Sequence, residues 1–291
     1  MSVEQDEADI EASRAPLMSH LIELRQRLII SIIALAIGFG VCFFYSKDIY
    51  LFLLQPYGMA ERLLAMQKTS GPHGPFDLPL TLIGLKSAPA ATAHLNLVFT
   101  APLEFFFTKV QMAGFGGLVV AFPVIAWQLY RFVSPGLYKR ERYAFLPFLI
   151  ASPILFLMGA ALVYYVMLPF VLWFSLSQTI DSGNISVQAL TKVSDYLTLI
   201  TTLLLAFGLC FQLPVILSLL GMADLVSSKF LASGRRYAIV GVFAVAAVVA
   251  PPDPFSMIAL AVPVCLLYEI SIWCVRLIEL RRKKEEAEEE A

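Results

Sequence analysis

The residue of this chain best suited to bind a cationic ligand is Glu23, in the string HLIELRQRL over 20–28. It comes just before the 19 uncharged residues 28–46, so its carboxylate would lie where the chain leaves water. Leucines at helical spacing predict an amphipathic helix here: Leu17, Leu21, Leu24 and Leu28. Glu23 and Arg27 are also four residues apart, and a solvated pair of this kind contributes only about 0.2–0.5 kcal/mol. The residues alone leave both interpretations open.

A second candidate carboxylate, Glu141, lies in the string FVSPGLYKRERYAF over 132–145. Ser134, Pro135 and Gly136 form a strong turn signal between two apolar segments. Three basic residues adjoin Glu141, so a solvated loop charge is the alternative to a receptor role.

Four further polar residues lie in or beside the apolar segments. Gln212, in FQLP, needs a hydrogen-bond partner on a neighbouring helix or a place along a substrate path. Glu269 lies in the last apolar segment, where charge pairing or snorkelling is the simpler account. Asp253 and Glu104 precede apolar helices and fit helix starts.

The sequence gives no support to catalysis or to a bound cofactor. It contains no HExxH, phosphate-binding loop, nucleophile elbow or dinucleotide fingerprint. Its 4 cysteines all fall in apolar runs, and its 3 histidines are too scattered to form a metal site. We therefore expect neither an enzyme, nor a metal site, nor a nucleic-acid partner.

The composition indicates an all-α integral membrane protein. The 291 residues are 59% hydrophobic and only 15% charged, against about 25% charged in soluble domains. A helix needs about 20 apolar residues to cross a bilayer. The string APPDPF over 250–255 predicts a break between two short final helices, and an interfacial piece is expected from Pro169. The six expected spans are 28–46, 110–130, 143–165, 198–221, 237–250 and 255–274.

The basic residues predict the orientation of these spans. Of the 21 Lys and Arg, 15 lie in the four segments that six spans would leave on one side, so both termini are expected in the cytoplasm. The membrane domain would cover 17–276, between a disordered acidic tail over 1–16 and a charged tail over 277–291, its acidic end disordered. The outer loop 47–109 carries extra sequence around 60–95 of unassigned role.

Four strings in this order resemble the TatC family, the polytopic receptors of the twin-arginine protein translocase. They are HLIELRQRL, FVSPGLYKRER, FQLP and APPDPFS, and the resemblance runs from about residue 17 to 276. It implies a protein of the bacterial inner membrane that binds twin-arginine signal peptides of folded precursors at its cytoplasmic face. It also implies use of the proton-motive force, the single-span partners TatA and TatB, contact with membrane lipid, and a homo-oligomer in the receptor complex.

The resemblance also assigns roles to residues. It implies that Glu23 and Glu141 contact the arginines of the signal. Further residues that it places in the signal-binding site are Arg25, Phe132, Pro135 and Leu137, and those with structural roles are Pro56 and Pro123.

The chain departs from the family pattern in places. Gln212 stands where relatives often carry a glutamate, and Met257 where some carry a glutamine. A proton-coupled small-solute transporter using Gln212 and Glu269 is the alternative function, and a passive membrane scaffold is a third.

Overall fold

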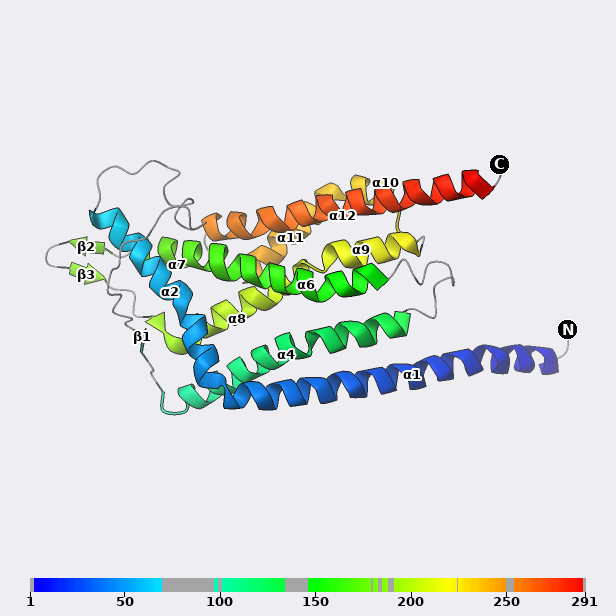
Figure 1. The fold of residues 1–291 in the computed structure, drawn as a ribbon, viewed down its shortest axis with the longest axis horizontal. Helices are drawn as coiled ribbons and strands as arrows, with labels where there is room; N and C mark the ends of the chain where they lie inside the picture. The colour runs from blue at the N-terminus through cyan, green and yellow to red at the C-terminus, as the bar shows by residue number, and fades with distance from the viewer. Residues whose placement is uncertain are drawn as a thin grey trace.

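The computed structural model describes residues 3–69, 97–98, 101–133, 146–178, 180–182, 185–187, 191–223, 225–249 and 254–289. Long helices lie roughly alongside one another (Figure 1), and helix α1 begins at the same end of the bundle at which helix α12 ends. We call this end the terminal end. The predominantly helical architecture confirms the predicted class, with two small β-ladders added at the opposite end.

Helix α1, Val3–Phe44, and helix α4, Glu104–Val133, cross at glycines. A Cβ added at Gly38 would lie 2.7 Å from the carbonyl oxygen of Gly117, and one at Gly117 would lie 2.6 Å from the backbone nitrogen of Phe39. Small residues let two helix backbones approach this closely. The crossing fixes which side chains face each other nearer the terminal end.

Helix α2, Ser46–Thr69, lies in the segment that the sequence analysis assigned to the outer loop 47–109. One side of it is buried, with Leu53, Tyr57, Ala60 and Leu63 each 3% exposed or less. These positions recur at helical spacing, and Leu53, Tyr57 and Ala60 belong to the main apolar core. The segment predicted as the outer loop 47–109 therefore contains helix α2, and its last residues, 104–109, open α4.

Helix α6, Leu146–Leu162, continues through the π-turn η2, Val163–Met167, into helix α7, Leu168–Ser177. A separate interfacial piece from Pro169 was predicted, but the chain stays helical. The reason is the π-turn: Leu168 N–H bonds to Val163, five residues back, and Pro169 falls in the first turn of α7, where its missing N–H is not needed.

Helix α8, Val193–Cys210, is followed by helix α9, Leu213–Met222. A turn at Phe211 and Gln212 separates them, and Pro214 lies in the first turn of α9. The fourth predicted apolar segment is therefore two helices, with Gln212 at their junction.

The last helices are α10, Ser228–Ser233, α11, Arg235–Val249, and α12, Pro254–Glu289. Helix α11 has 15 residues, so it is about 22 Å long at 1.5 Å per residue, shorter than a bilayer core of about 30 Å. Asp253, predicted at the turn between α11 and α12, lies outside the described residues.

The strands are short. β1, Leu97–Val98, pairs in parallel with β4, Thr191–Lys192. β2, Ile180–Ser182, pairs antiparallel with β3, Ile185–Val187, and Ile180 lies opposite Val187. They cap the end of the bundle opposite the termini (Figure 1).

Five helical segments among the described residues are long and apolar enough to cross a membrane: 21–44, 104–132, 150–177, 193–222 and 256–282. Helix α11, with 15 residues, is shorter than each of these five segments.

The two tails differ from their prediction. Residues 3–16 belong to α1, and α12 reaches Glu289, whereas disorder was expected over 1–16 and at the acidic C-terminal end. Glu, Ala, Lys and Arg are strong helix formers, and extending an existing helix avoids the cost of nucleation.

Candidate functional site

Glu23 is held by a neighbour on its own helix. Its Oε1 accepts a hydrogen bond from Nη2 of Arg27 at 2.8 Å, and the side chains are 31% and 18% exposed, respectively. The i,i+4 pair that the residues left open is therefore formed. A carboxylate offers about four lone-pair sites, so this one bond leaves room on Glu23 for a further donor.

Arg27 also contacts helix α4. Its Nη1 donates to Oε1 of Gln128 at 3.3 Å, and Gln128 is only 8% exposed. In the described part of the chain, the buried Nε of Arg27 has no hydrogen-bond partner. The arginine thus joins Glu23 to the last turns of α4.

This link places Glu23 near the end of helix α4. Helix α4 ends at Val133, five residues after Gln128, and residues 134–145 follow directly. Phe132 is half-buried in the last turn of α4, and Arg25 is exposed on α1. The remaining predicted binding residues, Pro135, Leu137 and Glu141, lie outside the described residues.

Gln212 makes a closed pair with helix α6. Ser152 donates its hydroxyl to Oε1 of Gln212 at 2.7 Å, and Nε2 of Gln212 donates back to the Ser152 carbonyl at 2.9 Å. Both residues are buried. Of the two interpretations of this amide, the structure favours hydrogen bonding between helices.

Glu269 pairs with Arg235 across α12 and α11. Arg235 Nε lies 2.8 Å from Oε1 of Glu269, and its Nη2 donates to Oε2 at 2.8 Å, a two-pronged contact. Glu104 forms a start to α4: its Oε2 accepts from the Ala101 N–H at 3.1 Å, and its Oε1 accepts from the Ser194 hydroxyl.

The proline positions are also visible. Pro56 lies inside α2 and is buried, whereas Pro123 lies inside α4 and is exposed.

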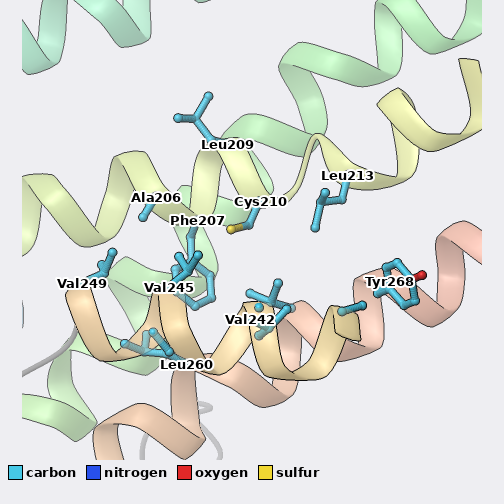
Figure 2. Close-up of a pocket in the computed structure, with 14 residues that line it drawn as sticks. Ala206, Phe207, Leu209, Cys210, Leu213, Val242, Val245, Val249, Leu260 and Tyr268 are labelled. Carbon is cyan, nitrogen blue, oxygen red and sulfur yellow. The ribbon is translucent and has the colours of Figure 1, made fainter. Parts of the chain in front are cut away.

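An apolar cavity of about 480 Å³ lies between α8, α11 and α12 (Figure 2). Among the described residues that line it, only Tyr268 and Cys210 carry a hydroxyl or thiol group. Gln212 is not among its lining residues, and its amide is hydrogen-bonded to Ser152. The lining residues are Ala206, Phe207, Leu209, Cys210, Leu213, Ala238, Gly241, Val242, Val245, Ala246, Val249, Leu260, Val264 and Tyr268.

Four side-chain partners of the candidate residues were not predicted from the sequence: Gln128, Ser152, Ser194 and Arg235. A partner role for Gln128 could have been predicted, because an amide at the end of an apolar segment needs a hydrogen-bond partner just as Gln212 does. The pairing of Ser152 with Gln212 and that of Arg235 with Glu269 could not be predicted, because each depends on which helices pack together. Among the described residues, no three His, Cys, Asp or Glu side chains gather as they would around a metal ion.

Comparison with known proteins gives the family. Residues 19–263 match the family described as Sec-independent protein translocase protein (TatC). The chain belongs to the TatC family. This is a protein-transport family rather than an enzyme family, in agreement with the expectation that the chain is not an enzyme.

Curated relatives match over nearly the whole chain. The Sec-independent protein translocase protein TatC of Magnetococcus marinus is 39% identical over 97% of this chain and 92% of its own length. That of Aquifex aeolicus is 35% identical over 93% of this chain and 98% of its own.

A solved structure has the same fold. The crystal structure of a twin-arginine translocase receptor, TatC, superposes with a TM-score of 0.68 at 33% identity, covering 89% of this chain and 99% of that one. The chain is thus a helical membrane protein of a translocase family. None of these observations favours the small-solute transporter, since Gln212 and Glu269 are both engaged by neighbouring helices.

Proposed function

We propose that this chain is the receptor core of a twin-arginine translocase, and that Glu23 binds one arginine of the signal peptide. The observation that carries the proposal is the Glu23 carboxylate, which is 31% exposed near the last turns of α4 and already accepts a guanidinium donor at 2.8 Å. The geometry there suits an arginine, because the planar fork matches a carboxylate.

Glu141 is proposed to take the second arginine. The support is the path of the chain: Arg27 and Gln128 join Glu23 to the end of α4, and the segment containing Glu141 begins there. Arg25, Phe132, Pro135 and Leu137 are proposed to complete the site. Hydrogen bonds to charged groups contribute about 1.5–3 kcal/mol each, so two carboxylates supply useful affinity.

The apolar stretch that follows the arginines is proposed to lie in the apolar cavity of α8, α11 and α12. The cavity is lined almost entirely by aliphatic and aromatic side chains, and short α11 forms one wall. For a signal peptide arriving from water, each Å² of apolar surface buried there would contribute roughly 25 cal/mol.

The location, orientation and partners of the chain are proposed from its family and from the distribution of its basic residues. The chain would lie in the bacterial inner membrane with six spans, α11 being the fifth. The terminal end of the bundle would face the cytoplasm, because most Lys and Arg lie on the segments near it. TatA, TatB and further copies of this chain are the proposed partners, and the proton-motive force is the proposed driving force. Asp253 is proposed as a polar group of the outer hairpin.

Binding of synthetic peptides to the full-length chain in lipid nanodiscs tests the proposal. One peptide carries two consecutive arginines before an apolar stretch, and the other carries two lysines. We expect the wild-type chain to prefer the arginine peptide, and Glu23→Gln and Glu141→Gln each to weaken its binding about tenfold or more.

Asp48→Asn is the charge-matched control. Asp48 is exposed in the first turn of α2, at the opposite end of the bundle, so its loss should leave binding unchanged. Equal binding of both peptides by the wild-type chain would contradict the proposal, as would full binding by Glu23→Gln.

A further inference from the structure

The carboxylate proposed to receive a guest arginine is occupied in the free chain by the chain's own arginine. Nη2 of Arg27 lies 2.8 Å from Oε1 of Glu23. A guest guanidinium offers the same chemical group with the same fork. It can form a full two-pronged contact with Glu23 only if Arg27 releases the oxygen that it holds.

We propose that Arg27 is an internal competitor, which closes the Glu23 site until a signal arginine displaces it. This inference rests on the proposed function, since it concerns how that same site is regulated. Arg27 would then do more than pair with Glu23 on the surface of α1, because it would lower the affinity of the receptor for the signal peptide.

The surroundings of Arg27 favour such an exchange. Gln128 accepts from Nη1 at 3.3 Å, so the guanidinium keeps a partner on α4 when Glu23 leaves it. The Nε atom is buried and, among the described residues, has no hydrogen-bond partner, so the closed arrangement leaves one donor unsatisfied. At 18% exposure the side chain is confined near the pair but still reaches water. Both arrangements therefore have compensating contacts.

Competition of this kind has a quantitative signature. If the site is open in only a fraction of molecules, every ligand that needs the open site loses affinity by that same fraction. A pair of this exposure closes the site in roughly two thirds to five sixths of molecules. Removing Arg27 should then tighten binding of the twin-arginine peptide about three- to sixfold.

The experiment compares Arg27→Gln with Arg131→Gln in the full-length chain in lipid nanodiscs at physiological salt. Arg131 is exposed near the end of α4, so its loss removes the same charge near the site without touching Glu23. We expect Arg27→Gln to bind the twin-arginine peptide about three- to sixfold more tightly than Arg131→Gln does.

A second variant keeps the arginine and its charge. In Gln128→Glu a carboxylate on α4 would draw the Arg27 guanidinium away from Glu23, and binding of the twin-arginine peptide should again tighten. This variant decides the question if Arg27→Gln does not fold.

The inference is overturned if Arg27→Gln binds no more tightly than Arg131→Gln, or if it weakens the arginine peptide, which would make Arg27 a positioning residue for Glu23. Glu23→Gln separates this result from a failure of the proposed function. If Glu23→Gln weakens binding while Arg27→Gln does not tighten it, the competitor alone is wrong. If Glu23→Gln has no effect, both proposals are wrong.

Discussion

The hydroxyl of Tyr164 donates to the backbone carbonyl of Phe52 at 2.5 Å, and Phe52 lies four residues before Pro56 in α2. In a regular helix that carbonyl would accept from the N–H of residue 56, which a proline lacks. Tyr164 is 5% exposed, and its ring stacks on that of Phe52 with 4.4 Å between centroids. We infer that Pro56 frees an acceptor by which α2 is attached to the π-turn η2.

Tyr164→Phe should therefore destabilise the chain. The substitution removes the donor of this part-buried hydrogen bond, at a cost of about 0.5–1.5 kcal/mol. The melting temperature of the purified chain in detergent measures it. Tyr165→Phe is the control, because the Tyr165 side chain is 54% exposed.

The background Pro56→Ala sharpens this test. Alanine restores an N–H four residues after Phe52, so Tyr164→Phe should cost less in that background than in the wild-type chain. An equal cost in the two backgrounds would show that the hydroxyl does not compensate for the proline.

A second prediction concerns the crossing of α1 and α4. Gly38→Ala would place a methyl group 2.7 Å from the Gly117 carbonyl oxygen, so the helices must separate, at a cost of about 1–3 kcal/mol. Gly40→Ala is a matched control two residues away, where a Cβ meets nothing within 4 Å and alanine improves helix propensity. Thermal unfolding should show a lower midpoint for Gly38→Ala only. Similar midpoints for the two variants would mean that the close approach of the two helices does not contribute to stability.

The positions of the long helices could be predicted from the sequence because a membrane span is recognised by its length and apolar character alone. Segments 21–44 and 104–132 overlap their predicted spans for this reason. Helix α2 was missed because it is amphipathic, contains a proline and lies among polar residues that read as a loop. Its helical form depends on the core against which Leu53 and Tyr57 pack.

Glu23 could be chosen from the sequence because a carboxylate at the edge of an apolar run is unusual. Its environment could not be predicted in the same way. The contact of Arg27 with Gln128 depends on how α1 crosses α4, which the glycines at 38 and 117 determine through backbone contact. Arg27 and Gln128 are 101 positions apart in the chain, so their contact could be predicted only if the crossing were already known.

A third prediction concerns the buried pair of Gln212 and Ser152. Ser152→Ala removes the hydroxyl that donates to Oε1 of Gln212 and leaves that buried oxygen with one partner fewer, so we expect a loss of about 1–3 kcal/mol. Ser175→Ala, at an exposed position on α7, is the control and should change stability little. Denaturation in detergent, followed by tryptophan fluorescence, compares the two. An unchanged midpoint for Ser152→Ala would indicate that Gln212 finds another partner.

The last prediction concerns the ion pair of Arg235 and Glu269. Its contact is two-pronged, with both distances at 2.8 Å, but the side chains are 48% and 42% exposed. Exposed pairs contribute about 0–1 kcal/mol, so Arg235→Gln should lower stability by less than about 1 kcal/mol. Arg236→Gln is the matched control, because its neighbouring guanidinium lies over the ring of Tyr237 and not on Glu269.

The salt dependence of this loss separates attraction between charges from packing. Screening at high salt weakens an exposed pair, so the difference between Arg235→Gln and Arg236→Gln should shrink as salt is raised from about 0.05 to 0.5 M. The charge-swapped double variant, Arg235→Glu with Glu269→Arg, should recover most of the stability that either single reversal loses, because only the reversals place like charges together. A difference that persists at high salt, or a double variant no better than the single reversals, would show that the side chains join α11 to α12 by packing, with no net contribution from their charges.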